Sequence, residues 1–165
     1  MRIVADASTL ILLAKAEILL LVTEEYSFWI PGAVRRECLV KQTLDARMIS
    51  AVLDTGKIIV RPSGASGTIR TLRRDFSLHC GEAEAVEMAL REKIPLAVDD
   101  YAAMKACRIL GIKFATAIHF VMALKKIGRL DVKTAEARLE KLAHFGRYSS
   151  RILQDALGQI RGEEE

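Results

Sequence analysis

Short apolar runs alternate with longer helix-like stretches along most of the chain. Each run is ended by a polar residue, a proline or a glycine, and this pattern predicts short buried strands. The predicted strands cover residues 2–5, 28–30, 58–60, 96–98 and 112–115. Single strands that alternate with helices favour a mainly parallel sheet covered by helices on both faces. The expected fold class is therefore α/β, with about five short strands in one sheet.

Apolar residues at helical spacing predict the elements between these strands. Ala83, Val86 and Leu90, for example, share one face of a predicted helix. Ser8 or Thr9 is expected to cap the first helix. The predicted helices cover residues 10–22, 33–39, 44–53, 68–76, 81–92, 102–110, 117–127, 132–144 and 149–160.

Composition is that of one globular domain. A length of 165 residues fits a single domain, and a hydrophobic content of 51% is ample for a buried core. No repeat or linker divides the chain, so residues 1–162 are expected to form one domain, followed by an acidic tail at residues 163–165. The cysteines Cys38, Cys80 and Cys107 are far apart and are predicted to be buried thiols rather than disulfide partners.

The most apolar stretch, residues 10–22, is expected to be a buried helix rather than a membrane span. It is interrupted by Lys15 and Glu17, and the chain contains no run of about 18 uncharged apolar residues. It also lacks the preceding positive cluster and the following small-residue cleavage site of a secretory signal. A cytoplasmic location without membrane contact is therefore expected.

Carboxylates follow two of the predicted strands directly. Asp6 comes after the first strand, and Asp99 and Asp100 come after the fourth. In open parallel sheets the ligand site lies at the carboxyl ends of the strands. Clustered carboxylates repel one another unless a cation neutralises them, and Mg²⁺ and Mn²⁺ prefer such oxygen ligands. The placement therefore predicts a divalent-metal site at this edge.

Each acid also has a structural interpretation. Asp6 alone is more typical of a helix cap, and Asp99 with Asp100 can equally be a cap pair that interacts with a helix dipole. Glu37 can be a solvated surface acid. Glu82, at the start of a helix, is well placed for the helix dipole without any metal. Only the joint placement of these acids favours a site.

Five segments together are similar to a known family. They are IVADASTLILLAK, IPGAVRREC, GEAEAVEMAL, LAVDD and GIKFATAIHFV. Over residues 2–130 the chain resembles the PIN domain family of Mg²⁺- or Mn²⁺-dependent ribonucleases. The GEAEA helix followed by a strand that ends in two aspartates resembles a subgroup related to the VapC-type toxins. The resemblance implies a three-layer α/β/α fold with a mostly parallel central sheet.

The resemblance also assigns site residues. In PIN domains the first strand ends in an Asp, with Ser or Thr two residues later, and these positions match Asp6 and Ser8. The second acid lies on a helix and matches Glu37. The third is usually an Asp that opens an alanine-rich helix, and here Glu82 occupies that position. This departure adds one methylene and puts the strength of metal binding in doubt.

The fourth acid of the family follows the fourth strand. The family register favours Asp100, with Asp99 as its neighbour or substitute, and Thr116 matches a hydroxyl near the metal. The implied catalytic residues are Asp6, Glu37, Glu82 and Asp100; the implied metal ligands are Asp6, Glu82, Asp99 and Asp100; Ser8 and Thr116 are expected to orient the carboxylates.

The resemblance implies a metal-dependent endoribonuclease, with a toxin-like role, a small antitoxin partner and a homodimeric state as further expectations. A second hypothesis is a catalytically weak PIN domain that binds nucleic acid or a partner protein, because of Glu82. A third, a phosphatase or receiver-like domain, is disfavoured because Asp6 is followed by Ala7 and Ser8 rather than by the second acid of a DxD pair.

The charge balance permits RNA as a partner without requiring it. The chain has 25 Lys and Arg against 21 Asp and Glu, a net charge of +4. Aromatic residues make up only 5%, which gives base stacking little support. His79 is expected to be structural, and Tyr101 is the aromatic beside the acids. The residues expected to contact a phosphate backbone, although each cluster can equally be a solvated face, are Arg35, Arg36, Arg73, Arg74, Lys105 and Arg108.

Overall fold

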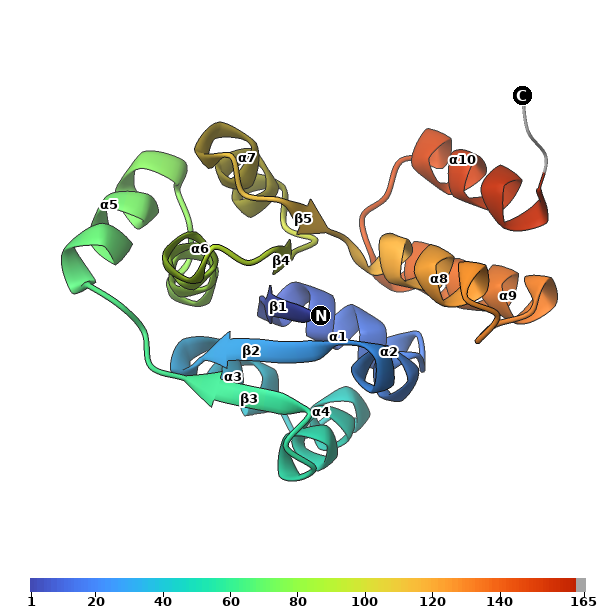
Figure 1. Cartoon of the computed structure of the whole chain (residues 1–165), viewed down its shortest axis with the longest axis horizontal. Helices are drawn as coiled ribbons and strands as arrows, with labels where there is room; N and C mark the ends of the chain where they lie inside the picture. The colour runs from blue at the N-terminus through green and yellow to red at the C-terminus, as the bar shows by residue number, and fades with distance from the viewer. Residues whose placement is uncertain (163–165) are drawn as a thin grey trace.

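Five parallel strands form the central sheet of the computed structural model, which describes residues 1–162 (Figure 1). The strand order is β3-β2-β1-β4-β5, and every neighbouring pair is parallel. The strands are β1 (Arg2–Ala5), β2 (Ser27–Pro31), β3 (Ile58–Arg61), β4 (Leu96–Ala97) and β5 (Phe114–Ala115). The predicted parallel sheet of short strands is confirmed.

The strand order reverses between β1 and β4. From β1 the chain adds β2 and β3 on one side, and it then returns to add β4 and β5 on the other. Ala5 lies opposite Ala97, the Asp6 N–H donates to the Ala97 carbonyl at 3.0 Å, and the next backbone bond joins Val98 to Ala115 at 2.9 Å. The residues that follow β1, β4 and β5 therefore meet at one edge, where ligands bind in open α/β sheets.

Helices flank this sheet in a three-layer α/β/α arrangement (Figure 1). Helix α6 contacts β1, β2 and β4, whereas α8, α9 and α10 pack against one another. The helices are α1 (Ala7–Lys15), α2 (Leu19–Glu25), α3 (Gly32–Leu39), α4 (Leu44–Asp54), α5 (Ser66–Phe76), α6 (Cys80–Glu92), α7 (Tyr101–Leu110), α8 (Ala117–Lys126), α9 (Val132–Phe145) and α10 (Ser150–Arg161).

The core holds the carboxyl edge of the sheet in place. Ile3, Val4 and Ala5 of β1 are almost completely buried, as expected for a parallel strand covered on both faces. Phe28 of β2 packs edge-on against Phe120 of α8, with ring centroids 5.8 Å apart. Burial of each large apolar side chain contributes about 1.5–3 kcal/mol. The residues that follow the strand ends are therefore attached to a tightly packed part of the sheet.

The prediction of one helix over residues 10–22 is wrong. Helix α1 ends at Lys15, and α2 begins at Leu19 after a turn in which Glu17 has a φ of 58°. The Glu17 carboxylate forms ion pairs with Arg138 and Lys141 of α9. Apolar residues on both sides of the turn are buried, so the apolar run continues through the break and conceals it.

Three smaller expectations also need correction. Asp6, rather than Ser8 or Thr9, caps α1 through its side chain, because its carboxylate lies at the start of the helix. Cys80 is exposed because it begins α6 at the surface. The predicted strand at residues 112–115 is shorter, because β5 pairs with β4 only at Phe114 and Ala115.

None of the helices in residues 1–162 has the length and apolar character needed to cross a membrane. The single-domain prediction for residues 1–162 stays a prediction, although one sheet and one main core cluster account for those residues. The acidic tail predicted at residues 163–165 lies outside the described part of the chain.

Candidate active site

Asp6 is the most deeply buried acid at the carboxyl edge, with only 1% of its surface exposed. One carboxylate oxygen accepts the Thr9 N–H at 3.0 Å, and the other accepts the Ser8 hydroxyl at 2.7 Å. Burial raises the pKa of Asp6 from 3.8 to about 7, although these two hydrogen bonds act in the opposite direction. The nearby charge of Asp99 adds to the rise. Asp6 therefore carries its charge at a considerable electrostatic cost.

Asp99 follows Val98 and lies beside Asp6. Its Oδ2 accepts the Thr9 hydroxyl at 2.7 Å, and the Ala117 N–H lies 3.0 Å from the same oxygen. Its Oδ1 accepts the Tyr148 hydroxyl at 2.5 Å. Burial raises the pKa of Asp99, and these hydrogen bonds oppose the rise. Donors from three parts of the chain thus hold both oxygens of this carboxylate.

Asp100 has a different environment from its neighbour. Its Oδ1 accepts the Ala103 N–H at 2.9 Å, so Asp100 caps α7. The charge of Asp100 contributes to a raised pKa of Glu82, after the larger effect of partial burial. Glu82 accepts the His79 N–H at 2.8 Å at the start of α6. Asp100 and Glu82 therefore face each other closely enough to repel.

Glu37 approaches the start of α6 from α3. A Cβ added to Gly81 would lie 2.8 Å from the Glu37 carboxylate, so the missing side chain at this buried glycine makes room for the acid. The Glu37 side chain is exposed, and its charge also raises the pKa of Glu82. Glu37, Glu82 and Asp100 thus form the outer part of the acidic edge, and Asp6 and Asp99 form its inner part.

The acids are neighbours, but they are not arranged as a finished ligand set. Within residues 1–162, no group of three or more His, Cys, Asp or Glu side chains is positioned to hold a metal ion. In the same residues, none of the five acids forms a salt bridge with a basic side chain. Oxygen ligands that repel one another and form no salt bridge fit a divalent cation by their chemistry, although the charge of His119 acts on Asp99 and that of His79 acts on Glu82. To complete a metal site, the side chains of the outer acids would have to move toward Asp6 and Asp99.

The two hydroxyls expected to orient the carboxylates are in different situations. Ser8 links the inner acids, because its hydroxyl donates to Asp6 and accepts the Asp99 N–H at 3.2 Å. The Thr116 hydroxyl instead lies 2.9 Å from Nδ1 of His119. The residue after Thr116 supplies the backbone N–H that reaches Asp99.

Sequence reasoning missed two partners of Asp99. Thr9 was considered only as a helix cap, although its hydroxyl binds the carboxylate. Tyr148 is separated from Asp99 by 49 residues and has no recognisable motif around it. Its position after the predicted helix at 132–144 gave no sign that the chain returns to the sheet edge there.

A family model described as PIN domain matches residues 2–162. The chain belongs to the PIN domain family. PIN domains are generally nucleases that act on nucleic acids and usually use divalent metals. The predicted resemblance to the PIN domain family is confirmed, whereas the VapC-related subgroup stays a prediction, and the match extends beyond the expected limit at residue 130. No curated protein and no solved structure matches this chain.

Basic side chains of this PIN domain lie around the start of α6. Arg36 of α3 and Arg73 of α5 both act on the thiol of Cys80, and their charges oppose the rise in its pKa that burial causes. A surface hollow of about 490 Å³ lies next to them, at the end of α5. His79, which bonds to Glu82, is one of its lining residues; the others are Arg70, Arg73, Arg74, Ser77 and Leu78.

The other basic residues expected to bind nucleic acid are exposed and more scattered. Arg35 is on α3, and Lys105 and Arg108 are on α7. The Arg108 guanidinium lies over the Phe114 ring, 5.4 Å from its centroid. Arg74 forms an ion pair with Asp75. Of the basic residues expected to bind nucleic acid, Arg73 and Arg74 therefore lie together with Arg70 at the α5–α6 junction of this PIN domain, next to His79.

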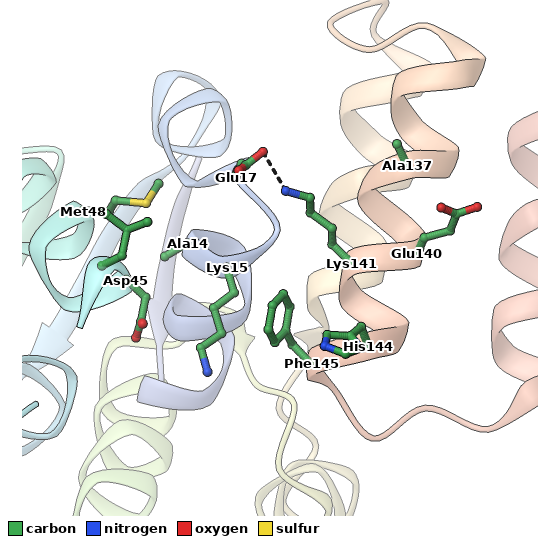
Figure 2. A pocket seen from close by; sticks show the side chains of 11 residues that line it. Ala14, Lys15, Glu17, Asp45, Met48, Ala137, Glu140, Lys141, His144 and Phe145 are labelled. Carbon is green, nitrogen blue, oxygen red and sulfur yellow. Dashed lines mark ion pairs between the residues drawn. The ribbon is translucent and has the colours of Figure 1, made fainter.

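A second hollow, of about 830 Å³, lies between α1, α4 and α9 (Figure 2). It begins beside Lys15 at the last turn of α1, whereas Asp6 precedes the first turn, roughly 14 Å away along the helix. Its apolar lining includes Met48 and the exposed side chains of Leu44 and Phe145. The hollow is therefore separate from the acidic edge of this PIN domain.

Proposed function

We propose that this protein is a divalent-metal-dependent endoribonuclease that hydrolyses RNA phosphodiesters at the acidic edge of its sheet. The observation that carries the proposal is the meeting of five acids that form no salt bridge within residues 1–162, namely Asp6, Asp99, Asp100, Glu82 and Glu37. Structural carboxylates in this number would be expected to have cationic neighbours, because unpaired repulsion destabilises the fold. A site for a cation accounts for their retention at the carboxyl ends of the strands.

Asp6 and Asp100 are the residues that we expect to hold Mg²⁺ or Mn²⁺ most directly. Asp6 is fixed on both oxygens by Ser8 and by the start of α1, whereas Asp100 accepts one backbone N–H at the start of α7. Glu82 and Glu37 approach from the outer side and are suited to complete the ligand set or to orient water. A bound divalent cation supplies Lewis-acid polarisation of the phosphodiester and of the attacking water.

RNA is the proposed substrate because basic residues flank the outer acids. Arg36 and Arg73 lie close to the start of α6, and the hollow at the end of α5 adds Arg70 and Arg74. Cations at these positions can neutralise phosphates on both sides of a scissile bond, and such binding weakens steeply with salt. Arg35, Lys105 and Arg108 extend the basic surface onto α3 and α7.

A fluorogenic single-stranded RNA assay in Mn²⁺ or Mg²⁺ tests this proposal. We expect Asp6→Asn and Asp100→Asn each to lower the cleavage rate more than about hundredfold, because even groups behind the metal ligands commonly cost ten- to hundredfold. Asp131→Asn is the matched control, since Asp131 caps α9 as Asp6 caps α1 and Asp100 caps α7. Cleavage that survives at the wild-type level in both site variants would overturn the proposal.

A second candidate is a catalytically weak PIN domain that binds nucleic acid or a partner protein. Glu82 stands where the family usually has Asp, and the apolar hollow between α1, α4 and α9 favours a protein partner such as a small antitoxin (Figure 2). Salt-sensitive RNA binding without cleavage in any divalent metal would favour this candidate. A toxin role, a homodimeric state and a cytoplasmic location stay predictions.

A further inference from the structure

The segment between α9 and α10 places Tyr148 beside the inner acid Asp99. The Tyr148 side chain is half-buried, and its hydroxyl lies 2.5 Å from Oδ1 of Asp99. Gly146 makes this path possible: a Cβ there would lie 2.8 Å from the Leu142 carbonyl oxygen and still closer to the Tyr148 ring. The backbone leaves α9 in an extended conformation at the glycine, and the Tyr148 ring occupies the space that a side chain would need.

Asp99 connects three separate elements. Tyr148 reaches it from the α9–α10 connection, the Thr9 hydroxyl from α1, and the Ala117 N–H from the start of α8. The Asp99 N–H in turn donates to Ser8, and the Ser8 hydroxyl donates to Asp6. A continuous series of hydrogen bonds therefore runs from Tyr148 to the most buried carboxylate of the site.

We propose that Tyr148 is a positioning residue of the acidic site, which holds Asp99 as a structural anchor and leaves Asp100 as the metal-facing member of the pair. Asp99 accepts hydrogen bonds from Thr9, Ala117 and Tyr148, one donor more than Asp6 has, so its role is to fix Thr9 and Ser8 against Asp6. The metal-facing part of this inference rests on the proposed function. The hydrogen-bonded network does not rest on it.

Charge and burial keep the Tyr148 hydroxyl a donor. Burial and the adjacent charge of Asp99 both raise the pKa of Tyr148 far above its ordinary value. A protonated phenol that donates to a carboxylate forms a charge-assisted hydrogen bond, which is among the stronger kinds in proteins. Partners behind the metal ligands typically change metal affinity ten- to hundredfold when they are removed.

Tyr148→Phe tests the inference because it removes only the hydroxyl. In metal-free protein, we expect the backbone amide NMR signals of Ser8, Thr9 and Ala117 to shift, although all lie far from residue 148 in sequence. In calorimetric titrations we expect Mn²⁺ to bind about tenfold more weakly. Tyr26→Phe is the matched control, since Tyr26 is also half-buried but packs against Phe120.

Gly146→Ala is the second variant. It keeps the hydroxyl but displaces the Tyr148 ring, so it should shift the same amide signals of Ser8, Thr9 and Ala117. This variant keeps the test decisive if Tyr148→Phe does not fold. Amide signals unchanged at Ser8, Thr9 and Ala117 in the folded variants would overturn the positioning role. Distant shifts with unchanged Mn²⁺ affinity would overturn its link to the metal. If wild type binds no Mn²⁺, the proposed function fails, and the amide signals alone decide the role of Tyr148.

Discussion

The inner and outer parts of the acidic edge are built differently. Asp6 and Asp99 are held on both carboxylate oxygens by hydroxyl and backbone donors, and burial raises the pKa of each. Asp100 and Glu82 instead each accept one backbone N–H at the start of a helix, and Glu37 is exposed. The inner acids thus have a fixed geometry, whereas the outer acids retain freedom to rotate.

This difference separates stability from ligand binding at one site. Fixed, buried carboxylates are sensitive to charge and to loss of their donors, so changes there should alter folding. Outer carboxylates near solvent should influence folding less, so the effects of changing them should appear mainly in metal binding. The following predictions test this contrast, from the largest expected effect to the smallest.

The largest effect should come from the charge of Asp6 in metal-free protein. Because its pKa is raised to about 7 in the fold, the folded state binds the proton more tightly than the unfolded chain. The contribution of this group to the free energy of unfolding should therefore be fully present below about pH 4. It should fall as the pH rises to 7, by up to about 4 kcal/mol. Chemical denaturation at several pH values measures this loss.

Asp6→Asn should remove that pH dependence, since the amide carries no charge and still caps α1. A metal-free variant with the same decline in unfolding free energy between pH 4 and 7 as wild type would contradict the assignment of the cost to Asp6.

Alanine substitutions at Asp99 and Asp100 should affect folding stability and RNA cleavage in different proportions. Asp99→Ala leaves the hydroxyls of Thr9 and Tyr148 and the Ala117 N–H without their acceptor, so we expect about 2–3 kcal/mol of destabilisation. Asp100→Ala loses a helix cap, which costs about 1 kcal/mol. Relative to this smaller loss of stability, it should lower the cleavage rate more than Asp99→Ala does. Denaturant melts and RNA cleavage measured on both proteins give the comparison. Equal effects on both properties would remove the distinction between anchor and ligand.

Glu82→Asp introduces the acid that the predicted family register places at this position. Because the outer acids are adjustable, we expect Mn²⁺ affinity to change by less than about tenfold, or about 1.4 kcal/mol. Titration calorimetry measures the change, and Glu82→Gln serves as the charge-removing control. A complete loss of binding in Glu82→Asp would mean that the outer geometry is as constrained as the inner one.

The smallest effect should come from the basic surface. Replacing Arg36 and Arg73 together by Gln should weaken single-stranded RNA binding several-fold and reduce the slope of log affinity against log salt by about 1.4, for two lost phosphate contacts. Fluorescence anisotropy at several salt concentrations measures the slope. Replacing Lys126 and Arg151 together by Gln is the control for net charge, since it also removes two positive charges from exposed positions, and an equal change in that variant would argue against a specific path for RNA.

The strand ends explain how much of the site could be predicted from sequence. Asp6 follows β1 directly and Asp99 follows β4 after Val98, and parallel strands must bring their carboxyl ends to one edge. The family register added Glu37 and Glu82, which their local sequence alone did not distinguish from surface acids. The local sequence pattern was sufficient for acids that lie at the ends of neighbouring strands. The family register was needed for acids that lie on the helices.

Long-range partners and local breaks could not be predicted in this way. Tyr148 reaches Asp99 only after the chain has built α8 and α9, so its position depends on the packing of those helices. The turn at Glu17 interrupts an apolar run whose two halves are both buried, so hydropathy does not change there. The freedom of the outer acids is likewise a property of side-chain contacts rather than of sequence spacing.

Calorimetric titration of metal-free protein with Mn²⁺ is the most direct test of the central claim that these acids form a divalent-metal site. The expected result is saturable binding by wild type and by Asp131→Asn, with affinity lowered more than about hundredfold in Asp6→Asn. Wild-type protein that takes up no Mn²⁺ at millimolar concentration, or Asp6→Asn protein that binds it as tightly as wild type, would contradict the claim.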